Sequence, residues 1–459
     1  MTHRAAAASP AIAAMRRTIR GRVVGPDEAD YDTLRALMYG GLDRQPAAIV
    51  RVADADDVAR AVHAARESGL ELAVRGGGHS SAGHSTTEGG IVIDTRDLAT
   101  VEIDPAGRTA WAGAGLTAAA YTTATAEHGL ATGFGDTGSV GITGLTLGGG
   151  IGYLVRKHGL TIDSLLAAEI VTADGARLDV DATSHPDLFW AIRGGGGNFG
   201  VVTRLQFRLH PVDRVAGGML VLPATPDTVA GFIAEAEAAP DELSTIANVM
   251  NCPPLPSVAE EHHGTLVILA IVCHAGDLAD GERVIARFRS LAEPLADLVR
   301  PMPYPEIYPP DDPDYHPTAV GRTMFVERVD RSTAELIVDR LAASDASLRV
   351  AQLRVLGGAM ARVPTDATAF AHRSSRILVN VAAFYDGPDD LPRREAWVED
   401  LAAALRQGDD GAYVNFLGDE GEARIRAAYP HQTWQRLAAV KATYDPTNLF
   451  RLNQNIRPA

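Results

Sequence analysis

Residues 133–152 read Gly-Phe-Gly-Asp-Thr-Gly-Ser-Val-Gly-Ile-Thr-Gly-Leu-Thr-Leu-Gly-Gly-Gly-Ile-Gly, with nine glycines among these positions. Each glycine costs a helix roughly 1 kcal/mol relative to alanine, so the composition excludes an ordinary stable helix over this stretch. Glycine also lets a backbone approach another group without interference from a Cβ atom. The composition therefore indicates a segment that is shaped around a bound ligand rather than around its own side chains.

A second glycine cluster precedes this segment. It reads Val74-Arg-Gly-Gly-Gly-His-Ser80 after an expected strand, and it continues to Gly83 and Ser85. Consecutive glycines after a strand expose backbone N–H groups that bind phosphate, and Arg75 would add positive charge to such a nest. A tight turn with a histidine satisfied by the backbone is the alternative for this cluster taken alone.

The third cluster is Arg193-Gly-Gly-Gly-Gly-Asn-Phe-Gly200, and its residues 195–200 match the pattern Gly-x-Gly-x-x-Gly. A nicotinamide-binding Rossmann fingerprint needs a strand before that pattern and a helix after it. Here residues 187–192 are expected to be helical and residues 201–209 to form a strand. This reversed order excludes a nicotinamide site of that kind.

Charge and cysteine content restrict the classes of function. The 459 residues include 42 lysines plus arginines and 58 aspartates plus glutamates, which gives a formal net charge of −16. A surface with this charge repels phosphate backbones and anionic lipid, so neither nucleic acid nor a membrane is expected as a partner. The two cysteines, Cys252 and Cys273, are too few for a disulfide framework. We expect a small-molecule substrate and a monomer or homodimer.

The N-terminal residues do not match a secretory address. An alanine-rich stretch is broken by Ser9 and Pro10, and Arg16 and Arg17 follow it, whereas a secretory signal places its positive charge before a leucine-rich core. The sequence contains no run of 18 apolar residues, which a bilayer-spanning helix would need. We expect residues 1–18 to be a partly ordered leader into the first strand, and the location to be cytoplasmic.

The pattern of expected elements changes near residue 211. Residues 47–74 predict a β-α-β opening, followed by mixed strands and helices. Later strands alternate with amphipathic helices, which is typical of an antiparallel sheet in an α+β domain; the expected strands are 266–272, 348–356 and 376–384. Residues 301–317 hold seven prolines, so this loop is expected to be neither a helix nor a central strand. The predicted fold class is α+β with two domains.

Together these clusters resemble the FAD-linked oxidases of the vanillyl-alcohol-oxidase superfamily, in particular the berberine-bridge-enzyme-like branch. The resemblance covers nearly the whole chain. It rests on residues 75–85, on the glycine-rich segment ending Leu-Gly-Gly-Gly-x-Gly, and on four later stretches. These are Asp187-Leu-Phe-Trp-Ala-Ile-Arg-Gly194, Ala369-Phe-Ala-His-Arg373, Tyr413-Val-Asn-Phe416 and Tyr444-Asp-Pro-Thr-Asn-Leu-Phe-Arg-Leu-Asn-Gln-Asn-Ile456.

The resemblance implies a bipartite FAD-binding domain of the PCMH type. Residues 1–213 would form this domain together with a returning C-terminal segment, 411–459. Residues 214–410 would form an α+β substrate-binding domain with an antiparallel sheet, placed over the flavin.

In the family, the histidine that ends the Gly-Gly-His stretch carries the flavin through a covalent bond to its ring methyl, and His79 is the matching position. Many members add a second link from a cysteine. Thr137 stands at that position here, so a single attachment is implied. Val140 matches a residue beside the oxygen-accessible face of the flavin, where valine is typical of oxidases and a bulkier leucine of poor oxygen reactivity. Simple packing of the loop is the alternative for Val140.

The resemblance assigns one set of residues to the cofactor FAD. They are Arg75, Gly76, Gly77, Gly78, His79, Ser80, Gly83, Ser85, Thr137, Gly138, Val140, Gly141, Gly144, Gly148, Gly149, Gly150, Gly152, Val202, Asn415, Asn453 and Asn455.

Tyr413 is the candidate catalytic base. Tyr413-Val-Asn415 resembles the family's Tyr-x-Asn segment, which passes by the flavin, and in several carbohydrate and polyketide oxidases this tyrosine is the base. A free phenol has a pKa near 10, so Tyr413 would need a cationic or hydrogen-bonding neighbour. A tyrosine that anchors a sheet edge is the alternative.

The predicted function is an FAD-dependent oxidase that transfers hydride from an alcohol to covalently bound flavin and reduces O2 to H2O2. The alcohol would be a hydroxyl of a sugar, a polyketide or another secondary metabolite. The presence of Tyr413 favours alcohols over amines. An amine oxidase of the hydroxynicotine type and a flavin dehydrogenase with poor oxygen reactivity remain the alternatives.

Three further groups were considered as site residues. The candidates for a pocket mouth are Tyr304, Tyr308, Tyr315 and His316. His372 is a candidate substrate contact, with a histidine satisfied by the backbone as the alternative. Glu260-Glu-His-His263 lacks ligand spacing on a defined element, so no metal site is expected.

Overall fold

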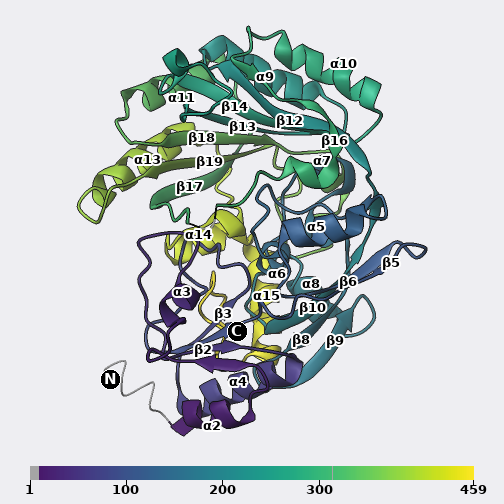
Figure 1. Ribbon diagram of the computed structural model, residues 1–459, viewed down its shortest axis with the longest axis vertical. Coiled ribbons are helices and arrows are strands. Elements are labelled where there is room, and N and C mark those ends of the chain that lie inside the picture. Colours follow the sequence, from purple (N-terminus) through teal and green to yellow (C-terminus); the bar gives the residue numbers. More distant parts are fainter. Residues whose placement is uncertain (1–9, 313) are drawn as a thin grey trace.

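The structure is a computed structural model that describes residues 10–312 and 314–459. Figure 1 shows two parts stacked along the long axis, with one large sheet in the upper part and smaller sheets in the lower part. The predicted α+β class is confirmed. Residues 1–9 of the expected leader lie outside the described residues. Residues 10–18 form helix α2 (Pro10–Thr18), whose Ile12 and Met15 are buried.

The first small sheet contains the predicted β-α-β opening. Its strands follow the order β1-β2-β4-β3, where β2, β4 and β3 are parallel and β1 is antiparallel. The bounds are β1 (Arg22–Val24), β2 (Ala48–Arg51), β3 (Leu72–Arg75) and β4 (Ile91–Asp94). Helix α4 (Ala55–Ser68) connects β2 to β3, and the Asp54 side chain caps it by accepting from the Asp57 N–H. The first glycine cluster therefore begins where β3 ends.

The second small sheet is antiparallel, with the order β5-β6-β10-β8-β9. Its strands are β5 (Val101–Asp104), β6 (Thr109–Gly113), β8 (Leu165–Val171), β9 (Arg177–Asp181) and β10 (Val201–Arg208). The third glycine cluster lies between helix α8 (Pro186–Ala191) and β10, which confirms the helix-before-strand order. In the turn between β8 and β9, Gly175 has a positive φ of 83° and Asp174 does not.

The upper part is an eight-stranded antiparallel sheet with the order β15-β12-β14-β13-β18-β19-β17, and β16 also pairs with β12. Its strands are β12 (Arg214–Pro223), β13 (Leu243–Asn251), β14 (Leu266–His274), β15 (Ala296–Asp297), β16 (Arg300–Pro303), β17 (Ala319–Val326), β18 (Arg349–Val355) and β19 (Ile377–Phe384). Helices cover its outer face (Figure 1): α9 (Pro226–Ala238), α10 (Leu278–Arg289) and α11 (Arg331–Ala343), with α13 (Leu391–Leu405) beside β17 and β19.

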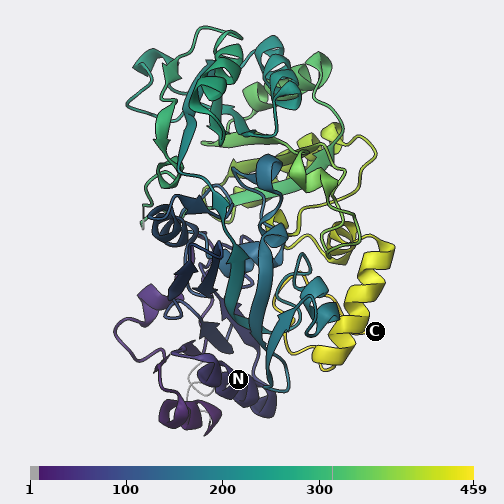
Figure 2. The same cartoon turned by 90° about the vertical axis from the view of Figure 1, so that its right-hand side faces the viewer.

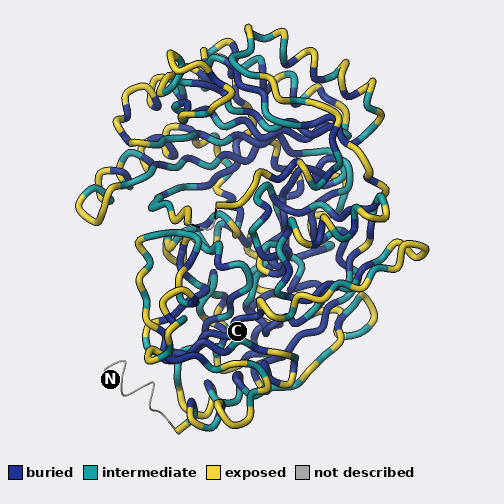
Figure 3. The backbone as a smooth tube through the Cα atoms, in the orientation of Figure 1, coloured by how far each residue is buried: buried dark blue, intermediate teal, exposed yellow. Residues whose placement is uncertain are grey.

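Strands β12, β13 and β17 were not among the strands expected from the sequence. Gly217 and Gly218 interrupt the apolar pattern of β12, and polar residues such as Ser244 and Asn248 interrupt that of β13. Pairing with neighbouring strands compensates for these weak local signals. Most residues of β12 and β13 are buried, in the large sheet at the top of Figure 3.

The proline-rich loop is partly ordered into regular structure. Pro301 and Pro303 belong to the short strand β16, which pairs with β12 near the margin of the sheet, and 3-10 helix η3 (Tyr304–Ile307) follows. Proline is tolerated at such an edge because no second ladder partner needs its missing N–H. The loop is therefore not a central strand, as predicted, but it is more regular than expected.

The C-terminal segment returns to the lower part. It contains 3-10 helix η4 (Val414–Phe416), α14 (Glu422–Ala428) and α15 (His431–Tyr444), and Figure 2 shows α15 packed along the side of the lower part. The remaining elements are α3 (Tyr31–Arg35), α5 (Ala118–Ala126), β7 (Leu130–Ala131), α6 (Ile142–Leu147), α7 (Val155–His158), η1 (Thr161–Asp163), β11 (His210–Pro211), η2 (Glu260–His262) and α12 (Ala359–Arg362). Within the described residues, every helix is too short or too polar to cross a membrane.

Candidate active site

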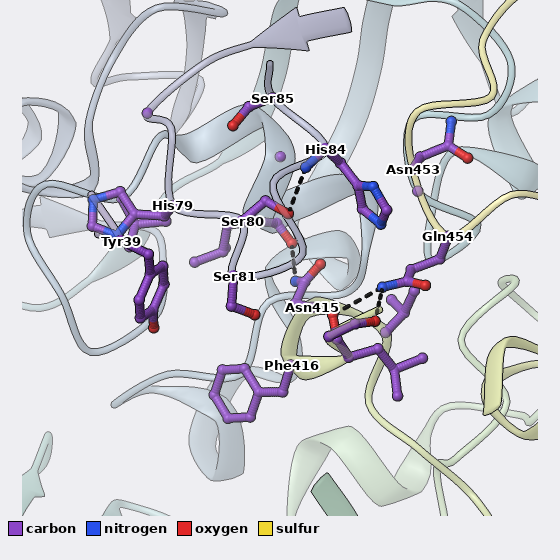
Figure 4. Close-up of a pocket in the computed structure, with 18 of the residues that line it drawn as sticks. Tyr39, His79, Ser80, Ser81, His84, Ser85, Asn415, Phe416, Asn453 and Gln454 are labelled. Carbon is purple, nitrogen blue, oxygen red and sulfur yellow. Dashed lines mark hydrogen bonds between the residues drawn. The ribbon is translucent and has the colours of Figure 1, made fainter. Parts of the chain in front are cut away.

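A cavity of about 690 Å³ is lined by segments from both parts of the molecule. Its wall includes all three glycine clusters, residues of β17, β18 and β19, and two stretches of the C-terminal segment, 413–419 and 450–454. Residues hundreds of positions apart in the sequence therefore meet at one site. Figure 4 shows a close-up of this wall.

The first two glycine clusters contact each other at Gly77 and Gly141. A Cβ atom at Gly77 would overlap the backbone nitrogen of Gly141, and a Cβ atom at Gly141 would overlap that of Gly77. Neither residue has a positive φ, so the close approach of the two backbones is what requires glycine here. This contact brings His79 and Val140 to the same cavity.

Most residues that the sequence assigned to FAD line the cavity. They are Gly76, Gly77, Gly78, His79, Ser80, Ser85, Thr137, Val140, Gly141, Gly144, Val202, Asn415 and Asn453. Their contact with FAD stays a prediction, but the fold brings them together.

Arg75 is one of the assigned residues that lie outside the wall. Its Nε donates to the Ser85 carbonyl oxygen at 3.1 Å, and its Nη1 donates to the carbonyl oxygen of Leu34. Burial lowers the pKa of the guanidinium to about 10. Arg75 Nη2 is buried without a hydrogen-bond partner among the described residues. Two donors of Arg75 therefore support the 75–85 loop and Leu34, and its expected place beside a bound anion stays a prediction.

The end of the glycine-rich segment packs against protein rather than against the cavity. A Cβ atom at Gly148 would overlap the Asn415 side chain, and one at Gly152 would overlap the carbonyl oxygen of Phe134. Gly150 has a positive φ of 81°. These glycines serve close packing and backbone conformation. The assigned residues that do not line the cavity are Arg75, Gly83, Gly138, Gly148, Gly149, Gly150, Gly152 and Asn455.

Several residues of the wall were not predicted from the sequence. The third glycine cluster contributes Gly196, Gly197, Asn198 and Gly200, although no role was assigned to it after the nicotinamide pattern was excluded. His84 and Gln454 also line the cavity. The clustering of glycines was the signal that would have identified the third cluster.

His79 lies beside Tyr39 on one side of the cavity, and His84 and Gln454 lie on the other (Figure 4). Burial lowers the pKa of His79, against the opposing negative charge of Asp311 and Asp136. The imidazole is therefore held in its neutral form, in which one ring nitrogen keeps a free lone pair. A free lone pair is what a covalent bond to an electrophilic carbon requires.

Unpaired polar atoms in the wall fit a polar ligand. His84 Nε2, Ser85 Oγ and Asn453 Oδ1 are buried and have no hydrogen-bond partner among the described residues. A buried polar group without a partner costs about 1–3 kcal/mol, so a ligand that pairs with these atoms is stabilised. Other parts of the wall are apolar, including Leu72 and Phe450. An elongated dinucleotide such as FAD suits this division, with phosphates at the glycine loops and the adenine against apolar side chains.

Tyr413 is a fully buried member of the wall, with 2% of its surface exposed. Its hydroxyl oxygen accepts hydrogen bonds from Gly150 N–H at 3.0 Å, Ile151 N–H at 3.3 Å and Asn415 Nδ2 at 2.9 Å. Burial raises the pKa of Tyr413, and these donors and the charge of Arg354 act against the rise. Tyr413 precedes η4 and belongs to no strand, but it packs in one cluster with Phe325 of β17 and Leu378 of β19, so the alternative of a sheet-edge anchor stays open.

Strands β18 and β19 present polar side chains to the cavity. Arg354 pairs with Asp136 at 2.6 Å and also donates to Gln352 Oε1. Gln352 Nε2 in turn donates to Asn248 Oδ1 at 2.9 Å. Asn380 lines the cavity and its side chain has no hydrogen bond to any other described residue. This face of the sheet can therefore bind a polar substrate.

The charges of the wall are unevenly compensated. Arg322 pairs with Glu399 at 2.8 Å, so both arginines of the cavity already have a carboxylate partner. Glu395 also lines the cavity, and it has no ion pair with the residues that the structure describes. A cationic group would therefore find a free carboxylate, whereas an anionic group would find no free arginine.

The candidates for a pocket mouth are not in the wall. Tyr304 and Tyr308 are buried in the core, Tyr315 is 48% exposed, and His316 Nδ1 lies 2.7 Å from the Leu37 carbonyl oxygen. The prediction is wrong for Tyr304 and Tyr308, whose side chains η3 turns into the core. It stays a prediction for Tyr315 and His316, because His316 contacts the backbone beside the cavity residue Met38.

His372 and the Glu260–His263 stretch also take structural positions. His372 Nε2 lies 3.0 Å from the carbonyl oxygen of Ala428, so the backbone satisfies it. Residues 260–262 form η2, and the described residues include no group of side chains that could hold a metal ion.

Comparison with known proteins places the chain among FAD-linked enzymes. Residues 46–181 match the family described as FAD binding domain, and residues 412–457 match the family described as berberine and berberine like. The (R)-6-hydroxynicotine oxidase of Paenarthrobacter nicotinovorans is 31% identical over 462 residues, which cover 96% of this chain and 97% of that protein.

Two solved structures have the same fold. The 6-hydroxy-D-nicotine oxidase of Arthrobacter nicotinovorans superposes with a TM-score of 0.84 at 30% identity, over 98% of this chain and 100% of that one. The glucooligosaccharide oxidase of Acremonium strictum has a TM-score of 0.84 at 22% identity, over 98% of this chain and 99% of that one. That enzyme is described as carrying a 6-S-cysteinyl, 8α-N1-histidyl FAD.

Proposed function

This chain belongs to the berberine-bridge-enzyme-like family of FAD-linked oxidoreductases, and we propose that it oxidises an alcohol group of a small-molecule substrate with O2 as the final electron acceptor. The placement of Tyr413 carries the proposal. Tyr413 lines the cavity, and its oxygen accepts a hydrogen bond from Gly150 N–H of the glycine-rich segment. A phenolate at this position is suited to accept the proton of a substrate hydroxyl.

The oxidation removes two hydrogens from the substrate. The O–H bond breaks and its proton goes to the oxygen of ionised Tyr413, while the C–H bond breaks with both electrons, as a hydride, and a C=O bond forms. Bound FAD would supply the acceptor for this hydride and a route for its two electrons to O2, which with two protons would give H2O2. Asn380 and Gln352 would orient the substrate, and the surrounding wall would exclude water.

The proposal includes a single covalent attachment of FAD at His79. The neutral imidazole of His79 supports it, as does the histidyl FAD of the related glucooligosaccharide oxidase. Thr137 occupies the place where a second, cysteinyl link would be made. The two cysteines of the chain are buried in the large sheet, Cys252 directly after β13 and Cys273 within β14.

The test is peroxide release from a substrate panel of sugars, aromatic alcohols and cyclic amines. We expect H2O2 from at least one alcohol, with one equivalent of O2 consumed for each peroxide formed. Tyr413→Phe keeps the ring and its packing but removes the proton acceptor, so turnover should fall at least 100-fold. Turnover of alcohols by Tyr413→Phe at the wild-type rate would refute the role of Tyr413.

A second candidate function is amine oxidation, which Glu395 favours. Its carboxylate faces the cavity without an ion pair to another described residue, and a protonated amine would pair with it. If amines are the substrates, Glu395→Gln should raise their KM while leaving kcat little changed. If neutral alcohols are the substrates, the same substitution should leave KM unchanged.

A further inference from the structure

The hydroxyl oxygen of Tyr413 receives more hydrogen-bond donors than a neutral phenol can use. A neutral phenol has two lone pairs and one proton of its own to donate. Three N–H groups point at the Tyr413 oxygen, from Gly150, Ile151 and Asn415. No acceptor for the Tyr413 proton lies among the described residues. This balance suits a phenolate, which accepts and does not donate.

Two of the three donors come from consecutive backbone amides. Gly149 and Gly150 both have positive φ, at 128° and 81°, which turns the N–H groups of Gly150 and Ile151 toward one point. Hydrogen bonds that an oxygen accepts favour its charged form. The two backbone amides at Tyr413 therefore favour a negatively charged oxygen.

The third donor is fixed in orientation by another contact. Asn415 Nδ2 donates both to the Tyr413 oxygen and to the Leu145 carbonyl oxygen, each at 2.9 Å. The carbonyl determines that the amide nitrogen, and not the amide oxygen, faces this way. Gly148 leaves the space that Asn415 occupies, since a Cβ atom there would overlap the Asn415 side chain.

Other buried tyrosines show the opposite arrangement. The hydroxyls of Tyr31 and Tyr429 donate to the carbonyl oxygens of Pro46 and Gly194, which favours their neutral form. Burial raises the pKa of Tyr31 to about 12. Tyr413 is buried more deeply than Tyr31, yet its oxygen meets N–H donors instead of a carbonyl.

Charged groups around Tyr413 are few. Arg354, the one charge that acts directly on its pKa, is neutralised by Asp136. Phe370 contacts the Tyr413 ring. Beyond Phe370, His372 is hydrogen-bonded to a backbone carbonyl, and Arg373 pairs with Asp163 at 2.7 Å. The backbone amides of Gly150 and Ile151, together with Asn415, are therefore the main local groups that favour ionisation of Tyr413.

From this geometry we infer that Gly150, Ile151 and Asn415 form a cradle that stabilises the phenolate of Tyr413, with Asn415 as a positioning residue of the reaction. The inference rests on the proposed function for its catalytic meaning, because the phenolate is the form that takes a substrate proton. The cradle itself can be tested without turnover.

The test is the pH titration of Tyr413 in the holoprotein labelled with [ζ-13C]tyrosine. Tyr413→Phe assigns its resonance. In the wild type we expect Tyr413 to ionise at lower pH than Tyr31 and Tyr429. Asn415→Leu, of similar size and without a donor, should raise the Tyr413 pKa by about 1–2 units, the value of one charge-assisted hydrogen bond. Asn415→Asp should raise it at least as much, because it places a negative charge there.

A matched glycine pair separates the cradle from general damage. Gly148→Ala should push Asn415 away and raise the Tyr413 pKa without altering either residue, whereas Gly231→Ala in α9, where a Cβ atom would meet the Leu291 side chain outside the cavity wall, should not. If Tyr413 ionises at or above the pH of Tyr31, or if neither Asn415→Leu nor Gly148→Ala shifts it, the inference is overturned. Because Asn415→Leu and Gly148→Ala are two independent variants, the inference can be tested even if one of them fails to fold.

Turnover separates this inference from the proposed function. If both hold, the pH profile of kcat/KM should shift upward in Asn415→Leu by as much as the resonance does. If Tyr413→Phe still turns over alcohols while the titration shifts as expected, the base role fails and the cradle stands. If Tyr413→Phe is inactive and Asn415→Leu leaves the titration unchanged, the cradle fails and the base role stands.

Discussion

Arg354 and Asp136 form an ion pair of 2.6 Å, although 218 positions separate them in the chain. Arg354 lies on β18 of the large sheet, and Asp136 lies in the glycine-rich segment beside Thr137. The arginine side chain is 5% exposed and the aspartate 27%. The pair therefore joins the substrate-facing strands to the expected flavin-binding loop inside a mostly buried site.

The first prediction concerns this pair. Arg354→Met should lower the free energy of unfolding by about 3 kcal/mol, because it leaves Asp136 and Gln352 without their donor, and removal of one partner of a buried pair is costly. Urea unfolding of the holoprotein measures the loss. The double variant with Asp136→Asn should recover at least half of it, since no unpaired charge then remains. If the loss of unfolding free energy in the double variant equals the sum of the losses in the two single variants, the two residues are not coupled.

The second prediction concerns flavin attachment. After precipitation with trichloroacetic acid, wild-type protein should stay yellow, and His79→Ala should release all its flavin into the supernatant. Peptide mapping should find one flavinylated peptide, the one that contains His79, because Thr137 has no thiol. The Cys252→Ser/Cys273→Ser variant is the control and should retain its flavin. A flavin adduct on either cysteine would contradict the single attachment.

Much of the fold could be predicted from local sequence. The β-α-β opening and the expected strands 266–272, 348–356 and 376–384 have strong local patterns, and the structure contains them near those residues, the three strands as β14, β18 and β19. Strands β12 and β13 were missed because glycines and polar residues hide their pattern, and their stability comes from long-range pairing. The division at residues 213 and 410 stays a prediction, although all strands of the large sheet lie within 214–384.

The site was predictable as a set of glycine clusters, but the role of each glycine was not. Gly77 and Gly148 each lie in a run of three glycines, yet Gly77 lines the cavity and Gly148 leaves the space that Asn415 occupies. The sequence likewise does not show that two donors of Arg75, Nε and Nη1, are taken by backbone carbonyls. Such differences depend on which distant segment lies opposite, and one sequence does not carry that information.

The third prediction concerns oxygen access. Val140→Leu adds one methylene to a residue of the cavity wall, at a cost of about 1–3 kcal/mol if the site is tightly packed. Stopped-flow measurement should find that anaerobic reduction by substrate is unchanged while reoxidation in air slows at least tenfold. Val140→Ala is the matched control and should reoxidise as fast as wild type. Loss of both half-reactions in Val140→Leu would indicate general damage instead of blocked oxygen.

The fourth prediction concerns the buried pair Lys441 and Asp445, whose charged atoms lie 2.7 Å apart at 0% exposure. Lys441 Nζ also donates to the carbonyl oxygens of Asn198 and Phe450, two residues of the cavity wall. Burial lowers the pKa of Lys441, and the charge of Asp445 opposes this. Lys441→Met should cost about 3–5 kcal/mol in urea unfolding and weaken FAD binding. Lys157→Met, at a partly buried lysine with one carbonyl acceptor, is the control and should cost less.

The last prediction concerns stability in acid and the stacked imidazoles of His158 and His210. Their ring centroids lie 4.0 Å apart with an interplanar angle of 13°, and His210 Nε2 lies 3.0 Å from Ser164 Oγ. Burial lowers the pKa of His158 to about 3, with further lowering by His210 and Lys157. Burial likewise lowers the pKa of His210 to about 4, together with the charges of Arg208 and Lys157.

Lowered pKa values in the folded state fix the direction of the pH effect. The unfolded chain protonates both histidines near pH 6.5, whereas the folded protein keeps them neutral down to about pH 4. On unfolding in this window, the two histidines together bind up to about two protons, and the free energy of unfolding falls as the pH drops from 6.5 toward 4.

His158→Phe keeps the stacked ring but removes one titrating group. The slope of unfolding free energy against pH should therefore decrease by the equivalent of about one proton. Urea midpoints across this range measure the slope, with His431→Phe at an exposed position as the matched control. An unchanged slope in His158→Phe would mean that the stacked pair does not contribute to acid sensitivity.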